Sequence, residues 1–227
     1  LRRMSRSVPH LSPEGRILVV LAASGVFGSL FLVSQHLGSF GTSVIGLGGD
    51  PYQTLWRFEA LADALRGGAL SPPGEPFRNF GPLPWMPIHV FFGQPWSYNV
   101  VWMLQAPLAA AATFVLGRVL GLRMLPAALA GVLVAFAPYR LAQSLGHFGA
   151  MQLFWIPATL AACFAWMRSP SLVRSLLIGS LLIGLAWTEH TLFLTGVVGL
   201  LILSFSFRFP LADVLMKKRP RRLALLV

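Results

Sequence analysis

The sequence contains a single cysteine, Cys163, which lies in an apolar stretch. One cysteine excludes a disulfide framework within the chain and a cysteine-based metal site. Charged residues are also scarce, since they make up 11% of the 227 residues, against about 25% in a typical soluble domain. Hydrophobic residues make up 56% of the chain. This composition predicts an integral membrane protein with several membrane spans.

Acidic residues are few: 7 Asp and Glu stand against 18 Lys and Arg, for a net charge of +11. The basic residues occur in short clusters between hydrophobic runs, which is typical of membrane topology rather than of a nucleic-acid-binding face. No charged residue lies in the middle of a predicted span, and this argues against a pump or an ion-coupled transporter. We therefore expect membrane lipids as partners and no nucleic acid.

Six hydrophobic stretches are expected to form an all-α, polytopic transmembrane helix bundle, at about 17–35, 96–116, 126–136, 150–166, 176–187 and 191–207. Residues 1–16 form a basic terminus, residues 36–95 form a long first outer loop, and residues 208–227 form a basic loop that leads into a further span. With the N-terminus in the cytoplasm, 14 of the 18 Lys and Arg residues lie inside, as the positive-inside rule requires. The chain begins at Leu1 and stops within apparent span sequence, so we expect a fragment of a longer protein.

The first outer loop contains the stretch Gly48-Gly49-Asp50-Pro51, in which glycines permit a tight turn and proline suits the first position of a helix. Helical periodicity over 52–66 predicts an amphipathic helix on the membrane surface. Its apolar face would carry Leu55, Phe58, Ala62 and Leu65. The segment 80–92 is interrupted by three prolines and predicts an interfacial or re-entrant piece, with His89 as a surface residue.

Ionisable residues at the outer ends of the predicted spans are few, and they are Asp50, Arg140, His147, Glu189 and His190. A carboxylate can deprotonate an acceptor hydroxyl, and an arginine can bind a lipid-linked phosphate through two hydrogen bonds. Structural alternatives stay open, because Asp50 can cap a helix, Arg140 can anchor to headgroups, and Glu189-His190 can form a polar turn. Metal ligation by Asp50, Glu189 and the histidines is also open, although no spacing demands it.

Three motifs carry a resemblance to a known family: Gly48 to Pro51 with Leu55-Trp56, Phe136 to Ala142 with Gly146-His147, and Gln152 to Pro157. Together they resemble the N-terminal part of membrane glycosyltransferases of the GT-C superfamily. More narrowly, they resemble bacterial YfhO-type and mannosyltransferase-like polytopic membrane proteins. The resemblance covers about residues 17–207. Relatives are usually longer, and the Glu189-His190 pair matches no motif of the family.

The resemblance implies a transferase that uses a polyprenyl-phosphate sugar at the outer face of the cytoplasmic membrane. Asp50 would be the catalytic base or a metal ligand, and the segments 52–66 and 80–92 would be juxtamembrane helices that shape the site. The expected groups near the donor phosphate or lipid head are Arg140, His147 and Tyr139, and those near the acceptor are Glu189, His190 and Arg57. The alternative is a non-catalytic protein that handles lipids, as a flippase does, or that assists assembly.

Overall fold

The computed structural model describes residues 12–46, 50–67, 82–188 and 193–199, and at His36 and Asp50 it describes the backbone alone. The chain divides into two units, Leu1–Phe193 and Leu194–Val227. In the second unit only residues 194–199 are described, and they are helical. The predicted Glu189 and His190 therefore lie outside the described residues, as do Gly48 and Gly49.

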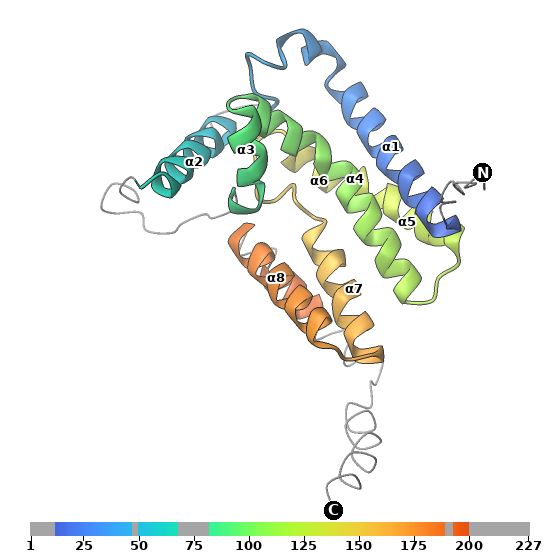
Figure 1. The fold of residues 1–227 in the computed structure, drawn as a ribbon. Coiled ribbons are helices and arrows are strands. Elements are labelled where there is room, and N and C mark those ends of the chain that lie inside the picture. The colour runs from blue at the N-terminus through green and yellow to red at the C-terminus, as the bar shows by residue number, and fades with distance from the viewer. Residues whose placement is uncertain (1–11, 47–49, 68–81, 189–192, 200–227) are drawn as a thin grey trace, which may run out of the picture. The chain divides into compact units, whose positions relative to one another are not determined.

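Within the described ranges the first unit contains helices and no strand, which confirms the all-α prediction (Figure 1). The longer helices are α1 (Pro13–Leu32), α2 (Asp50–Leu65), α4 (Trp96–Val119), α5 (Met124–Ala135), α7 (Trp155–Arg168) and α8 (Leu172–Thr188). The shorter ones are η1 (Ser34–Ser39), η2 (Leu83–Trp85), α3 (Met86–Phe92) and α6 (Pro138–Gln143).

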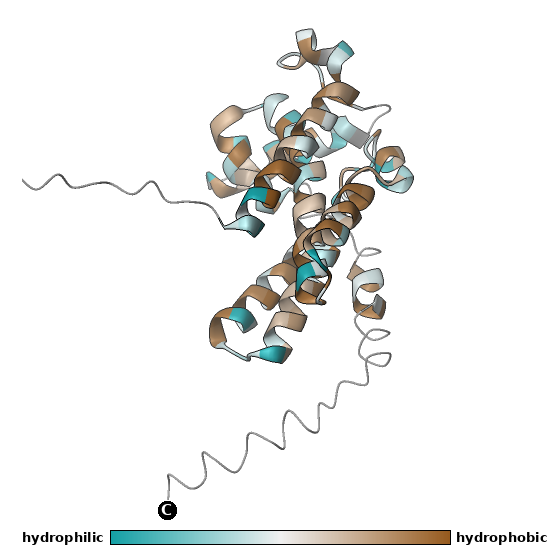
Figure 2. Cartoon of the chain, turned by 90° about the vertical axis from the view of Figure 1, so that its right-hand side faces the viewer, coloured by the Kyte–Doolittle hydropathy of each residue, from teal (hydrophilic) through white to brown (hydrophobic). Residues whose placement is uncertain are grey.

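Three segments of the described chain are long and apolar enough to cross a membrane, and they indicate a membrane protein. They are α1, α4 and the stretch Met124–Gln143, which joins α5 to α6. Brown, hydrophobic residues predominate along the long helices in Figure 2. The predicted fourth and fifth spans correspond to α7, with 14 residues, and α8, with 17. At 1.5 Å per residue, both described helices are shorter than the hydrocarbon core of a membrane, which is about 30 Å thick. The predicted sixth span is described only over 193–199.

Helix α4 is the centre of the packing, because α1, α3, α5 and α7 all contact it. Its proline, Pro107, removes the backbone donor that would bond the Met103 carbonyl. Ser29 of α1 donates its hydroxyl to that carbonyl at 3.3 Å. Gly25, one turn earlier on α1, lies directly on the backbone of Pro107. A missing hydrogen bond in one apolar helix is thus supplied by the neighbouring helix, as membrane proteins require.

The predicted helix over 52–66 is confirmed as α2, which begins two residues earlier, at Asp50. Three of the four residues predicted for its apolar face, Leu55, Phe58 and Ala62, are buried. The fourth, Leu65, is 65% exposed in the last turn. The proline-rich segment 80–92 forms the short helices η2 and α3, which are too short to cross a membrane.

Candidate functional site

Gly46, the last described residue before α2, lies directly on the turn that follows α6. Gly46 has φ 129°, and a Cβ at this position would lie 2.7 Å from the Leu145 carbonyl oxygen. Glycine is therefore required for both its backbone conformation and its lack of a side chain. Pro51, in the first turn of α2, has a fully buried side chain. The structure thus places the start of α2, the helix whose first residue is Asp50, next to the segment that follows Arg140.

A buried amide, Asn99 in the first turn of α4, holds the same loop. Its Oδ1 accepts the backbone N–H of Ile45 at 2.9 Å, and its Nδ2 donates to the carbonyls of Phe40 and Ser43 at 2.7 and 2.8 Å. The side chain is 0% exposed. Asn99 is therefore the main anchor of the chain between η1 and α2. No sequence motif predicted this role of Asn99, and the only signal for it is an amide among apolar residues near the start of a span.

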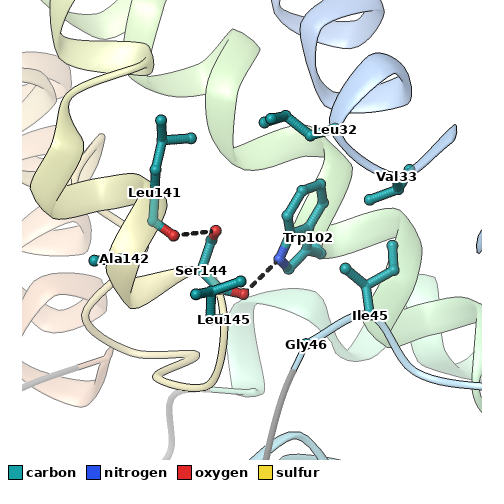
Figure 3. Close-up of a pocket in the computed structure, with 9 residues that line it drawn as sticks. All are labelled: Leu32, Val33, Ile45, Gly46, Trp102, Leu141, Ala142, Ser144 and Leu145. Carbon is teal, nitrogen blue, oxygen red and sulfur yellow. Dashed lines mark hydrogen bonds between the residues drawn. The ribbon is translucent and has the colours of Figure 1, made fainter. Parts of the chain in front are cut away.

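A cavity of about 470 Å³ lies between these elements (Figure 3). Its walls come from the end of α1, the loop before α2, one residue of α4, and α6 with its following turn: Leu32, Val33, Ile45, Gly46, Trp102, Leu141, Ala142, Ser144 and Leu145. The Trp102 indole donates to the Ser144 carbonyl at 2.8 Å, and the Ser144 hydroxyl donates to the Leu141 carbonyl at 2.7 Å. The polar groups of the wall therefore bond one another, and the cavity presents mainly apolar surface.

Arg140 of α6 is completely enclosed, with a relative exposure of 0%. Its Nη1 donates to the carbonyl of Ala135, the last residue of α5, at 3.0 Å. Its Nε and Nη2 have no hydrogen-bond partner among the described residues. These two nitrogens form one edge of the guanidinium, which is the edge that binds a carboxylate or phosphate with two parallel hydrogen bonds. Arg140 thus caps α5 with one nitrogen and holds two further donors in a buried position.

The other predicted donor-binding residues differ from Arg140 in exposure. Tyr139 is 52% exposed, and His147 is exposed in the turn after α6, whereas Arg140 between them in the chain is enclosed. Arg57 is half-buried on α2. Arg140 is thus less accessible than Tyr139 and His147, and a shared role of the three at a donor phosphate stays a prediction.

A second polar group, which the sequence analysis did not identify, connects α2 to α3 and α4. The prediction that His89 is a surface residue is wrong, because it is 4% exposed. Its Nδ1 lies 2.9 Å from the Ser97 hydroxyl, and its Nε2 lies 3.4 Å from a Glu59 carboxylate oxygen. The ring stacks on Phe58, with centroids 5.0 Å apart. Three helices therefore meet at one imidazole, which a pattern within a single helix cannot reveal.

Burial lowers the pKa of His89 below its ordinary value of 6.5. Glu59 raises it in part, and Arg66 adds a smaller lowering effect. The neutral imidazole satisfies both neighbours, since Nε2–H faces the carboxylate while Nδ1 accepts from the Ser97 hydroxyl. A Ser–His–Glu set can serve nucleophilic catalysis, but Ser97 is 0% exposed and no substrate reaches it in this conformation.

The described residues contain no group of three or more His, Cys, Asp or Glu side chains that could hold a metal ion. Metal ligation by Asp50 stays a prediction, because the structure gives only the backbone of this residue. No protein-family model matches the chain, and comparison with curated proteins and with solved structures finds no match either. The resemblance to the GT-C superfamily therefore rests on the sequence motifs alone.

Proposed function

We propose that this chain belongs to a multi-pass transferase of the bacterial cytoplasmic membrane, which moves a sugar from a polyprenyl-phosphate donor to an acceptor at the outer face. In this proposal the N-terminus is cytoplasmic and the remaining apolar segments complete a GT-C-like bundle. Asp50 accepts the proton of the acceptor hydroxyl or binds a metal ion. Arg140 pairs with the donor phosphate, and the groups near the acceptor include Arg57, Glu189 and His190.

The observation that supports this proposal best is the apolar cavity between the loop before Asp50 and the segment after Arg140. A polyprenyl phosphate carries an apolar chain and an anionic head on one molecule. The cavity offers apolar surface for the part of the chain next to the head. Asp50 and Arg140 belong to the two segments that border it, so a lipid held there would bring its head close to both.

The free edge of Arg140 gives a second reason for an anionic ligand. A buried charge without a counter-ion costs several kcal/mol. The carboxylates whose side chains are described face other residues, since Glu14 pairs with Arg118, Glu59 with His89, and Asp63 with Arg66. An anion from elsewhere would therefore complete the site. Because Arg140 is enclosed in this conformation, α6 would have to shift to admit a phosphate.

Transfer should depend on the carboxylate of Asp50. In liposomes that contain the chain and a panel of radiolabelled polyprenyl-phosphate sugars, we expect Asp50→Asn to reduce transfer by about 100-fold or more, because the base is lost. Asp63→Asn, on the same helix but exposed, is the matched control and should transfer as the wild type does. Undiminished transfer by Asp50→Asn would contradict the proposed role.

Arg140→Met should separate a ligand-binding role from a structural one. Methionine removes a buried charge, which favours the folded chain. It also leaves the Ala135 carbonyl unpaired, and the lost hydrogen bond lowers the free energy of unfolding by about 1 kcal/mol. We expect the free energy of unfolding to stay equal or to rise by about 1–2 kcal/mol. Donor affinity should fall about 30-fold or more, since a buried charge partner is lost. The exposed Arg168→Met is the control, and a destabilised Arg140→Met variant with full donor affinity would refute the assignment.

A lipid-handling protein without catalysis is the second candidate, and the apolar walls of the cavity favour it. In that case the wild type and Asp50→Asn would bind polyprenyl phosphates equally and consume none. The same liposome assay measures both quantities, so a result of binding without turnover selects this candidate.

A further inference from the structure

The cavity at the end of α1 has both exposed and buried residues in its wall. Three of its residues are exposed, and all three are apolar: Leu32, Ala142 and Leu145. These three residues are called the rim below. Val33 and Trp102, which also belong to the wall, are buried. The cavity therefore has an apolar rim at the surface of the first unit and a buried apolar back.

The rim continues the exposed apolar surfaces of two candidate membrane spans. Leu32 is the last residue of α1, on which the preceding Phe31 is also exposed. Ala142 belongs to the span-length stretch Met124–Gln143, on which Leu133 is exposed. In a membrane, exposed apolar side chains on such spans contact lipid tails. The rim therefore faces the bilayer rather than water.

We propose that the tail of a polyprenyl phosphate enters this cavity sideways from the bilayer, and that Trp102 forms the back wall that limits how much of the tail fits. The identity of the lipid rests on the proposed function, whereas the route of entry rests on the rim. Leu32 and Ala142 stand at the ends of their spans, so the cavity lies near the level of the headgroups. A tail that enters there keeps its phosphate at the membrane surface.

The wall suits a hydrocarbon chain better than it suits water. The Trp102 indole and the Ser144 hydroxyl donate to carbonyls of the segment 141–144, so these donors are already bonded. A buried water needs about two to four polar partners. A hydrocarbon tail needs none, and its carbons make dispersion contacts with the wall. The chemistry of the wall therefore favours an apolar chain from the bilayer.

Trp102 is placed to decide how much of the tail is recognised. Its indole N–H donates to the Ser144 carbonyl at 2.8 Å, which fixes the ring against the segment that follows α6 (Figure 3). The cavity of about 470 Å³ is small for a ligand site, since such sites span about 300–1,000 Å³. A few isoprene units fill it, and the rest of a long chain stays in the bilayer. Recognition should therefore depend on the isoprene units next to the head and not on the total length of the chain.

Photolabelling in vesicles of phosphatidylethanolamine and phosphatidylglycerol tests the occupant of the cavity. One probe is farnesyl phosphate with a diazirine on its first isoprene unit, and the other is phosphatidylglycerol with a diazirine in an acyl chain. At equal mole fraction we expect the farnesyl probe to label the segments around Val33, Ile45 and Ser144 about tenfold more than the other probe does. Equal labelling by both probes, or labelling spread evenly over the exposed faces of α1 and α5, would overturn the proposal.

Ala142→Trp tests the route of entry, because a large side chain at the rim should block it. Ala142 is exposed, so the added ring can lie in lipid without disturbing buried packing. We expect labelling of the cavity by the farnesyl probe to fall about tenfold or more. Leu133→Trp, exposed on α5 and absent from the wall, is the matched control and should be labelled as the wild type is. Full labelling of Ala142→Trp would refute entry through the rim.

Trp102→Phe tests the back wall through competition by unlabelled geranyl and farnesyl phosphate. In the wild type the two should compete within about threefold of each other at equal membrane concentration, since the units beyond the cavity make no specific contact. The smaller ring of the variant leaves more room at the back, so the longer competitor should gain about tenfold over the shorter one. An unchanged ratio in a folded variant would refute the role of Trp102. Ala142→Trp decides about the cavity itself whether or not Trp102→Phe folds.

Photolabelling measures occupancy without turnover, so the two proposals can fail separately. If no donor is consumed but the farnesyl probe labels the cavity as described, the proposed transfer fails and the lipid pocket stands. If transfer depends on Asp50 but the label lies elsewhere, the lipid pocket fails and the proposed transfer stands.

Discussion

Replacing Gly25 by alanine is expected to lower the free energy of unfolding by about 2 kcal/mol or more. A Cβ on Gly25 would lie 2.6 Å from the Pro107 nitrogen and 2.7 Å from its Cα, and both are backbone atoms. A side chain could rotate away, but a backbone cannot, so α1 and α4 would have to separate by about 1 Å. The separation would also weaken the bond from Ser29 to Met103. Unfolding in detergent micelles measures the loss.

Gly179→Ala is the matched control for this variant. Gly179 lies inside α8, and a Cβ there would meet no atom within 4 Å. The same substitution should therefore stabilise the chain by up to about 1 kcal/mol, because alanine is the better helix former. Equal effects of the two substitutions would show that the contact between Gly25 and Pro107 contributes nothing measurable.

Replacing Asn99 by leucine is expected to lower the free energy of unfolding by about 3 kcal/mol or more, because three hydrogen bonds are lost together. The Ile45 N–H and the carbonyls of Phe40 and Ser43 would lose their partner. Leucine has a similar volume, so the loss reflects hydrogen bonding rather than packing. Hydrogen exchange of the Ile45 amide should accelerate more than exchange in α4, because the loop before Asp50 loses its anchor.

Two further variants limit how the Asn99 result can be explained. Asn99→Asp keeps the acceptor for Ile45 but turns a carboxylate towards two carbonyls, so it should destabilise the chain as strongly as leucine does. Gln94→Met removes one partly buried bond, to the Leu55 carbonyl, and should cost only about 1 kcal/mol. A tolerated Asn99→Leu substitution would mean that the loop is held by other contacts.

The helices themselves were largely predictable, because their signals are local. The apolar spacing of Leu55, Phe58 and Ala62 predicted α2, and the structure begins this helix within two residues of the expected start. The three prolines of 80–92 predicted a segment that does not span the membrane, and the structure forms short helices there. The prediction was less accurate at α7, which begins at Trp155 instead of near residue 150. The turn that precedes it contains Gly146 and Gly149, and the hydropathy of a window does not register such a turn.

The site was predictable only in part, because it depends on contacts between helices. Asp50 and Arg140 stand out in the sequence as rare charges at span ends, and the structure places their segments on one cavity. His89 and Asn99 gave no such signal. Their burial comes from partners on other elements, Glu59 and Ser97 for the histidine and the loop around Ile45 for the amide.

By itself, the sequence determined that the chain is helical, apolar and basic between its apolar runs, because composition and periodicity act within each segment. The tertiary structure alone decided which polar groups are buried and which of them meet. Arg140 illustrates the difference, since its charge can be read in the sequence, whereas its enclosure arises from the packing of α6 against its neighbours. Burial changes the free energy of a charge by several kcal/mol, and only the arrangement of distant segments sets it.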